Sequence, residues 1–328
     1  MTNVRPPRRV PTANPEGRFS RRGLLAGAGA AALAAPFASS ALATAAIPAA
    51  DDEWSVLLDE KTLHHTTVLQ CFGFEPETER IYALQVHNND THALGLTELD
   101  HSGKETGHMV LDGFGHGGNI GVERVGSTTY LWTETDANPS SGYGRAITRF
   151  PFDSGTTLTY GESDLPIHRP VAGSTSNQPY VDNEGGRLIV RHRVSGVPKY
   201  GIYDLEAATA GNYDDPLAYI DQYIGEEGET FQGFCLHGDQ IHQSTGKAYT
   251  DEDGDNPPSG GGNAYLSTIT ADTGELVSRT KNLVAPDLVY REPEGLAIKP
   301  GSTPQLVMGF ATGEVGARTF SLFAKPVG

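Results

Sequence analysis

His116 is the residue whose type and surroundings most directly suggest chemistry. It lies in residues 113–118 (GFGHGG), where four glycines let the backbone approach a bound group closely. Histidine transfers protons near neutral pH, and a glycine-rich turn can present backbone N–H groups to an anion. A lone histidine in a turn is more often structural, but the polar neighbours described below favour a functional role.

Three other residues could complete an acid–base site around this histidine. Arg291 can pair bidentately with a carboxylate or phosphate, and Glu294 can orient His116 or act as its partner acid. Tyr290 can supply a hydroxyl or a face on which a sugar stacks, although it could equally be a packing residue. If the protein is an enzyme, we predict that these four residues are catalytic. The reaction would cleave a glycosidic or phosphodiester link, or eliminate across a uronic-acid unit.

A metal site is an alternative use of the histidines. Three histidines together with Glu294 could bind zinc or another divalent ion, from a pool of four: His64, His65, His192 and His237. No pair of them has a standard ligand spacing. Residues 250–262 (TDEDGDNPPSGGG) carry alternating aspartates, as calcium loops often do, but they lack the EF-hand pattern. A divalent cation, calcium or zinc, therefore stays open, and a solvated acidic loop is favoured for residues 250–262.

A fivefold repeat must position these side chains. Similar stretches begin at Gln70 (QCFGF), Asn119 (NIGVE), Gln178 (QPYVD), Gln232 (QGFCL) and Glu294 (EGLAI). The starts lie roughly 50 to 60 residues apart, close to the period of propeller repeats built from several short strands. Three residues before each start stand Thr67, His116, Thr175, Glu229 and Arg291. Five copies predict five blades around a central channel.

The polar residue that opens each copy is expected to face the channel. We therefore predict substrate contacts from the opening amides and from other polar residues near the repeats: Gln70, Asn119, Gln178, Arg191, Gln232, His65 and His237. The alternative is structural, because a buried amide must find a partner and could satisfy backbone groups across the channel. The sequence leaves both possibilities open.

A second repeat supports the same architecture. Alternating strands that end in aspartate and a turn are expected at residues 94–100, 146–153, 200–204 and 265–272, with a truncated copy at 318–324. Residues 54–58 (WSVLL) are a candidate strand to close the ring. We predict an all-β fold, a five-bladed β-propeller of four-stranded antiparallel blades, closed by N- and C-terminal strands. Helical character is weak and confined to residues 205–212.

The N-terminus predicts export. Residues 20–25 (SRRGLL) form a twin-arginine motif, followed by a mildly apolar run over 23–35 and an A-x-A site at 41–43. The run is too short and too weak to span a bilayer of about 30 Å. We expect residues 1–45 to be a signal peptide and residues 46–328 to be a single propeller domain. The protein would be secreted or held at the cell surface, with no transmembrane segment.

Charge limits the partners. The leader holds six arginines and one glutamate, a net +5, so its removal takes the formal charge from −17 to −22. This charge argues against nucleic acid and anionic membranes as partners. A local arginine cluster could still hold an anionic ligand. We expect a monomer.

The two cysteines, Cys71 and Cys235, could form a disulfide or remain buried thiols.

Three motifs resemble a known family. Residues 112–123 (DGFGHGGNIGVE), 132–135 (WTET) and 290–298 (YREPEGLAI) are similar to proteins named teichoic-acid biosynthesis protein C, whose propeller domain is shared with receptor-binding proteins of some phage tails. The resemblance covers residues 46–328. It implies a five-bladed propeller at the cell surface that meets a cell-wall or extracellular glycopolymer. It implies no particular activity and assigns no catalytic residue.

Two hypotheses follow. In the first, the exported propeller binds and cleaves an anionic glycopolymer or oligosaccharide, such as teichoic acid or a uronic-acid polysaccharide, at its channel face. In the second, it is a non-catalytic, lectin-like binding module. The sequence lacks an obvious close pair of carboxylates of the glycosidase kind, which favours the second slightly. A protein-interaction scaffold has the least support.

Overall fold

The computed structural model describes residues 54–87, 90–226 and 228–327. They belong to one compact unit, Ala46–Gly328. The predicted signal peptide, residues 1–45, lies outside the described residues, so its assignment stays a prediction. No helix in the described part of the chain is both long and apolar enough to cross a membrane.

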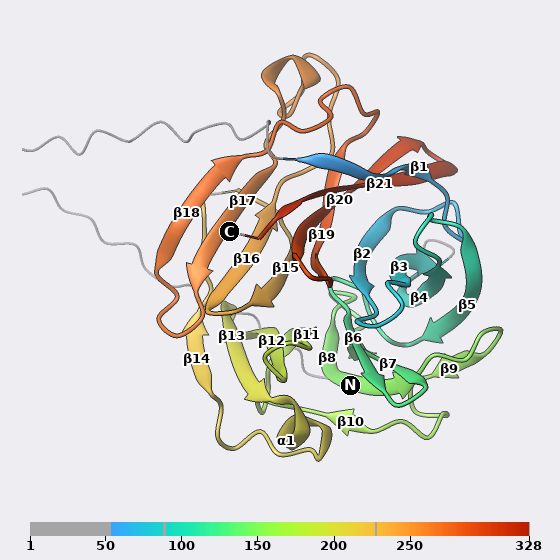
Figure 1. Ribbon diagram of the computed structural model, residues 1–328, viewed down its shortest axis with the longest axis vertical. Coiled ribbons are helices and arrows are strands. Elements are labelled where there is room, and N and C mark those ends of the chain that lie inside the picture. Colours follow the sequence, from blue (N-terminus) through green and yellow to red (C-terminus); the bar gives the residue numbers. More distant parts are fainter. Residues whose placement is uncertain (1–53, 88–89, 227, 328) are drawn as a thin grey trace, which may run out of the picture. The chain divides into compact units, whose positions relative to one another are not determined.

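Five antiparallel sheets are arranged as blades around a common centre (Figure 1). Blade 1 contains β2 (Leu69–Phe74), β3 (Ile81–His87), β4 (Asp90–Leu99) and β5 (Glu105–Asp112), and blade 2 contains β6 (Gly121–Val125), β7 (Thr128–Ala137), β8 (Gly144–Pro151) and β10 (Ile167–His168). Blade 3 contains β11 (Thr175–Asp182), β12 (Arg187–Val194), β13 (Val197–Asp204) and β14 (Ala218–Asp221). Blade 4 contains β15 (Phe231–His237), β16 (Gln240–Thr245), β17 (Tyr265–Thr270) and β18 (Leu276–Lys281). Blade 5 contains β19 (Glu292–Lys299), β20 (Gln305–Glu314), β21 (Ala317–Pro326) and β1 (Ser55–Lys61). The predicted all-β, five-bladed fold is confirmed.

The ring closes through strands from both ends of the propeller. Strand β1 is the outermost strand of blade 5 and pairs antiparallel with β21, with Ser55 opposite Ala324 and Val56 opposite Phe323. Figure 1 shows β1 beside β21. The expected closing strand at residues 54–58 is therefore confirmed, and it covers a sheet edge that would otherwise be free.

Two elements extend the four-stranded plan. The short strand β9 (Thr157–Thr159) leaves the blade 2 sequence and pairs parallel with β5 of blade 1, with Leu158 opposite Leu111. The single α-helix of the described residues, α1 (Leu205–Thr209), begins at Asp204, whose carboxylate caps the backbone N–H of Ala207. It falls within the segment of weak helical character that the sequence indicated.

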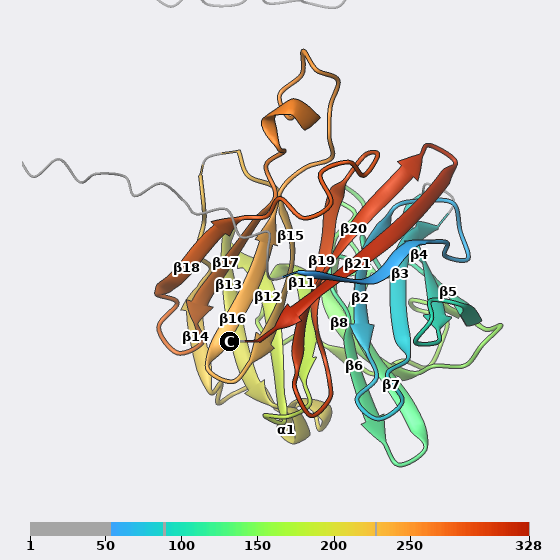
Figure 2. The same cartoon turned by 45° about the horizontal axis from the view of Figure 1, so that its top comes forward.

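The loop between β16 and β17 projects away from blade 4 and carries a 3-10 turn, η1 (Pro258–Gly260) (Figure 2). Its acidic side chains form no group with metal-ligand geometry among the described residues. Asp255 lies instead 3.4 Å from Nζ of Lys247. The structure therefore gives the calcium alternative no support at this loop.

The first strand of each blade is an inner strand, and the five inner strands β2, β6, β11, β15 and β19 contact one another in a ring. Glycine allows three of them to approach very closely. A Cβ on Gly233 would lie 2.7 Å from Cα of Gly295, and a Cβ on Gly295 would lie 3.0 Å from Cα of Cys71. The backbones of blades 4, 5 and 1 therefore nearly touch at this level and narrow the channel.

Apolar side chains fill the space between blades. Phe72, Phe234 and Phe310 are fully buried in one cluster that draws on several blades. Each such side chain stabilises the fold by about 1.5–3 kcal/mol. Cys71 and Cys235 are free and completely buried, and burial raises the pKa of both thiols. Of the two alternatives for the cysteines, the structure has the buried thiols.

Candidate functional site

A polar cavity of about 250 Å³ lies where the inner strands begin. We call it the polar mouth. All five blades line it: Val68 and Gln70 from blade 1, His116, Gly118 and Tyr143 from blade 2, Gln178 from blade 3, Thr230, Phe231 and Gln232 from blade 4, and Tyr290, Glu292 and Glu294 from blade 5. Contributions from every blade place the cavity at one end of the central channel.

Six of the residues predicted from sequence meet in this cavity. They are the predicted catalytic residues His116, Tyr290 and Glu294, and the predicted binding residues Gln70, Gln178 and Gln232. Five other predicted residues are absent from its lining: Asn119, Arg191, Arg291, His65 and His237.

Backbone irregularities aim the repeated polar residues. The ladder between β2 and β3 breaks register at Gln70, and that between β15 and β16 breaks at Gln232. The β19–β20 ladder breaks at Glu294, and the β11–β12 ladder breaks just before Gln178. A β-bulge inserts an extra residue and redirects a side chain, and bulges are common beside binding sites. Four blades therefore use the same device to present one polar residue to the cavity.

The three glutamines are only partly engaged by protein groups. Gln178 accepts a hydrogen bond at Oε1 from Nη1 of Arg191 at 3.1 Å. Gln232 donates from Nε2 to the carbonyl of Gly246 at 3.0 Å, and Gln70 makes one long contact of 3.4 Å to the carbonyl of Leu69. Within the described residues, the amide NH₂ of Gln178 has no protein acceptor. These amides retain donors and acceptors for a ligand.

Arg191 stands behind Gln178 instead of lining the polar mouth. Its side chain is 4% exposed, and Nε donates to Oε1 of Gln222 at 2.8 Å. The guanidinium also lies over the ring of Phe231, 3.9 Å from its centre. Burial lowers the pKa of Arg191 to about 10. The arginine lines a neighbouring cavity of about 240 Å³ and reaches the polar mouth through the amide of Gln178.

Glu294 is the most unusual group in the polar mouth. It is 5% exposed, and no group in the described parts of the chain forms a hydrogen bond with its carboxyl. Burial, helped by the nearby Glu292, raises the pKa of Glu294 well above its usual value. A raised pKa extends the pH range over which the carboxyl is protonated, and a protonated carboxyl can donate a hydrogen bond to a ligand oxygen.

Glu134 organises the loop that carries His116, although no role for it was predicted from the sequence. Its fully buried carboxylate accepts backbone N–H groups from Gly117 at 2.5 Å, from Gly118 at 3.2 Å, and from Gly144. A Cβ on Gly115 would lie 2.7 Å from Cδ of Glu134, so glycine is needed for this approach. Burial raises the pKa of Glu134 to about 7, against the lowering effect of these N–H groups.

The same carboxylate holds the backbone next to both blade 2 side chains of the polar mouth, His116 and Tyr143. It holds residues 117–118 after His116 and the backbone of Gly144 next to Tyr143. The rings of His116 and Tyr143 lie 4.8 Å apart between centres. Burial lowers the pKa of His116 and raises that of Tyr143, so both are neutral near pH 7. The WTET motif at residues 132–135 was a visible signal, but Glu134 lies 16 and 17 residues after the glycines that it contacts, and that separation hides the contact.

Arg291 does not take its expected place. It is 1% exposed and donates to the carbonyls of Asn282, Val284 and Ala285 at 2.8–3.2 Å. Tyr290 and Arg291 both have positive φ angles, 72° and 39°. This pair of left-handed residues turns Tyr290 toward the cavity and Arg291 toward the protein interior. The structure therefore places Arg291 outside the cavity in which the sequence analysis expected it to hold an anion.

The side chain of Asn119 satisfies a backbone group across the channel, which was the structural alternative to ligand binding. It is 1% exposed, and its Nδ2 donates to the carbonyl of Phe234 in β15 at 3.0 Å. The contact joins blade 2 to blade 4 across the centre of the ring. The three histidines that a metal site at Glu294 would need are also not brought together, because His116 is the sole histidine among the described residues that line the cavity with that acid.

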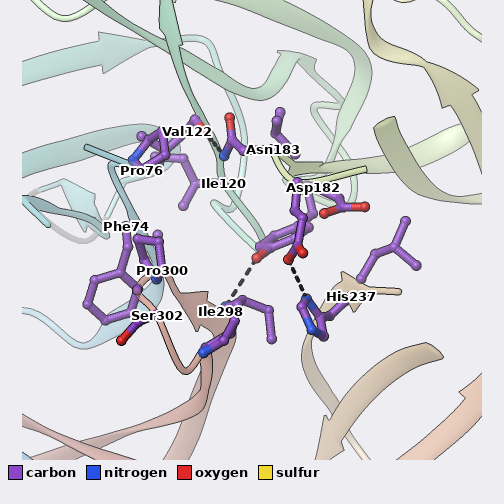
Figure 3. A pocket seen from close by; sticks show the side chains of 17 residues that line it. Phe74, Pro76, Ile120, Val122, Asp182, Asn183, His237, Ile298, Pro300 and Ser302 are labelled. Carbon is purple, nitrogen blue, oxygen red and sulfur yellow. Dashed lines mark hydrogen bonds and ion pairs between the residues drawn. The ribbon is translucent and has the colours of Figure 1, made fainter. Parts of the chain in front are cut away.

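His237 lies at the other end of the channel. A second cavity, of about 390 Å³, is lined by the last residues of β2, β11, β15 and β19 with the turns that follow them, and by Ile120 and Val122 at the start of β6 (Figure 3). Its walls include Phe74, Ile120 and Leu236, together with Asp182 and His237. Nδ1 of His237 is 3.6 Å from Oε2 of Glu184. We call this cavity the opposite mouth. His65 lies in neither mouth but in a histidine cluster on blade 1.

Two carboxylic acids share the polar mouth, a pairing that the sequence did not reveal. Glu292 and Glu294 are two residues apart on β19 and both line the cavity. Glu292 also lies 3.4 Å from Nε2 of Gln232. No lysine or arginine occurs among the described residues that line the cavity. The site therefore offers hydrogen-bonding groups and two acids, without a cation in its wall.

Two known proteins are similar to this chain. The chain is 26% identical over 292 residues to "Putative major teichoic acid biosynthesis protein C" of Bacillus subtilis (strain 168), which covers 82% of this chain and 61% of the relative. The tail fiber of Staphylococcus aureus phage P68 has a TM-score of 0.70 and 16% identity, over 84% of this chain and 52% of that chain. The latter likeness shows the fold alone. The chain thus spans little more than half of either protein.

A family described as the phage 5-bladed beta propeller receptor binding platform domain matches residues 68–324. This match includes all five inner strands and therefore every blade that lines the polar mouth. It agrees with the resemblance carried by the three sequence motifs. The chain belongs to the family of phage 5-bladed beta propeller receptor binding platform domains.

Proposed function

We propose that the protein binds a surface glycopolymer by taking one sugar or polyol unit into the polar mouth. The observation that carries this proposal is the lining itself, which brings three glutamines and two acids together with His116 and two tyrosines. Hydroxyl groups both donate and accept hydrogen bonds, and amides and neutral acids match them in both senses. At about 250 Å³ the cavity suits one small unit.

The charge of the lining narrows the expected ligand. A phosphate or carboxylate inside the polar mouth would meet Glu292 and Glu294, with no lysine or arginine among the described lining residues. Burying an unpaired anion beside acids is unfavourable. We infer that the hydroxyl-bearing unit of an anionic polymer enters the cavity, while its charged links stay outside.

The relatives support a binding role. One is named for teichoic acid biosynthesis, and the family is described as a receptor-binding platform. A teichoic-type polymer alternates phosphate links with hydroxyl-rich units, so it offers the kind of unit that the cavity suits. Export by the twin-arginine route, predicted from residues 20–25, would bring the protein to such a polymer.

A second candidate function is hydrolysis of the bound polymer. Glu294 has the raised pKa that a general acid needs, and Glu292, in the same cavity, would act as the base. A pair of carboxyl groups with separated roles is the common machinery of glycosidases. His116, neutral through burial, could instead accept the proton.

The two functions are separated by one set of measurements. The protein is titrated calorimetrically with a glycosylated glycerol-phosphate oligomer, with the same oligomer lacking sugar, and with a neutral oligosaccharide. Released reducing ends and phosphate monoesters are followed in parallel. Saturable binding without product supports the binding function. Product that disappears in Glu294→Gln supports hydrolysis. Absence of saturable binding to all three ligands would contradict both.

A further inference from the structure

Four histidines and a glutamate gather on blade 1, away from both mouths. His64 and His65 come from the segment between β1 and β2, and His87 ends β3. Glu105 and His108 belong to β5. We call these five residues the histidine cluster. The proposed binding function uses none of them.

Three members bring their ligand atoms to one point. Nδ1 of His64 lies 2.8 Å from Oε1 of Glu105, and Nδ1 of His108 lies 3.3 Å from the same oxygen. The two imidazole rings stack with centres 3.6 Å apart and planes 14° apart. The three ligand atoms all lie within 4.8 Å of one another. A zinc ion bonds nitrogen and oxygen at about 2.0–2.2 Å, so small side-chain movements would let one ion reach all three.

Local backbone features create this convergence. Residues three apart in a regular strand point to opposite faces. The β4–β5 ladder breaks register between Leu99↔Glu105 and Glu98↔Gly107, which leaves Thr106 as an extra residue. The bulge lets Glu105 and His108 face the same side of the strand.

The segment that supplies the remaining ligand is held before any ion arrives. The buried side chain of Gln85 accepts from the backbone N–H of His65 at 3.2 Å and donates to its carbonyl at 3.0 Å. The backbone N–H of His64 donates to Oγ1 of Thr97 at 3.2 Å. A Cβ on Gly95 would lie 2.1 Å from the ring of His65, so this glycine makes room for the cluster. A pre-organised backbone lowers the entropic cost of ligand binding.

The chemistry of the set favours a borderline transition metal over calcium or magnesium. Two imidazoles and one carboxylate are ligands that zinc uses in three-residue sites with an open fourth position. Calcium and magnesium require mostly oxygen ligands. The three side chains are 34%, 37% and 40% exposed, so an ion and a water molecule can reach them from solvent.

We propose that His64, Glu105 and His108 bind a divalent transition-metal ion of the zinc class. The ion would link the chain just after the closing strand β1 of blade 5 to the outer strand β5 of blade 1. It would therefore brace the seam at which the ring closes. A ligand that binds the folded state alone stabilises it in proportion to ligand concentration.

The test uses the full-length chain without a histidine tag, stripped with a chelator and then titrated with Zn²⁺ by calorimetry. Co²⁺ absorption reports coordination independently. We expect one saturable site, a Tm that rises with Zn²⁺ but not with Mg²⁺, and cobalt bands of a low-coordinate site. Glu105→Gln and His108→Ala should each weaken Zn²⁺ binding at least tenfold. Glu105 is exposed and His108 is half-buried, so circular dichroism should show unchanged folding.

His101→Ala is the matched control. His101 is an exposed histidine in the turn between β4 and β5, outside the cluster. Its replacement should leave zinc affinity and the cobalt spectrum unchanged. The proposal is overturned if wild type shows no saturable zinc site, or if His101→Ala weakens binding as much as His108→Ala does. It is also overturned if Glu105→Gln retains the wild-type affinity and spectrum.

Discussion

The carboxylate of Glu134 accepts a hydrogen bond from the backbone N–H of Gly117 at 2.5 Å, which ties strand β7 of blade 2 to the loop that carries His116. The same carboxylate reaches the backbone next to Tyr143. One buried acid thus positions two of the side chains in the polar mouth. Glu134 itself does not line the cavity, so it acts through the residues that it positions.

Replacing Glu134 with glutamine should destabilise the protein at acidic pH. The amide NH₂ would face backbone N–H groups where an oxygen now accepts, at a cost of about 1–3 kcal/mol. Chemical denaturation of the wild type and Glu134→Gln at pH 4.5 measures this difference. An unchanged free energy of unfolding would contradict the positioning role.

The pH dependence of this difference gives a separate prediction. The pKa of Glu134 rises from 4.5 to about 7 on folding, so its favourable contribution is complete below pH 4.5. The contribution is lost as pH rises through about 7, because the folded state binds the extra proton. The loss is about 3 kcal/mol. The stability deficit of Glu134→Gln should therefore shrink between pH 4.5 and pH 8. A deficit that stays constant or grows over this pH range would contradict the raised pKa of Glu134.

Arg291 should matter for stability and not for binding. Its guanidinium serves three backbone carbonyls inside the protein, which a lysine ammonium cannot serve in the same planar arrangement. Arg291→Lys should lower the free energy of unfolding by about 1–2 kcal/mol while glycopolymer affinity changes less than threefold. Denaturation and calorimetry measure the two effects. If Arg291→Lys kept normal stability but lost affinity for the glycopolymer, Arg291 would have to contribute to ligand binding.

Gly118 should control the orientation of Gln178. A Cβ at this position would lie 2.2 Å from Nε2 of Gln178, so the amide must swing away. Gly118→Ala should weaken ligand binding about tenfold with little loss of stability, because the displaced group is the end of a flexible side chain. Gly260→Ala, in the projecting loop, meets nothing closer than 3.9 Å and is the control. Equal effects of the two substitutions would rule out this role for the glycine.

The repeat predicted the fold because the number of blades and the closure of the ring depend on two patterns that the sequence shows. These patterns are the regular spacing of the repeats along the chain and the alternation of apolar residues within each strand. Residues 54–58 could be identified as the closing strand, and Gln70, Gln178, Gln232 and Glu294 as channel residues, from one alignment of the copies. A propeller places the same position of each copy at the same distance from its axis. That symmetry is why these residues could be predicted together.

Residues that depart from symmetry were harder to predict. Arg291 turns inward because Tyr290 and Arg291 adopt left-handed backbone conformations. In a sequence, glycine or asparagine indicates such a conformation, and these two residues are neither. Glu134 contacts a glycine run 16 and 17 residues earlier, and the cluster of His64, Glu105 and His108 depends on a bulge at Thr106. Such contacts are set by the packing of neighbouring strands, which sequence spacing does not encode.

The most direct test of the binding site compares the two ends of the channel. The dissociation constant of a glycosylated glycerol-phosphate oligomer is measured for wild type, for Gln178→Ala at the polar mouth, and for His237→Ala at the opposite mouth. We predict at least tenfold weaker binding for Gln178→Ala and an unchanged constant for His237→Ala. Gln178→Ala should lose about 1–3 kcal/mol of stability because Arg191 loses an acceptor, so circular dichroism must show that both variants are folded at the temperature of the titration. Weaker binding for His237→Ala, with Gln178→Ala unchanged, would contradict the polar mouth as the binding site.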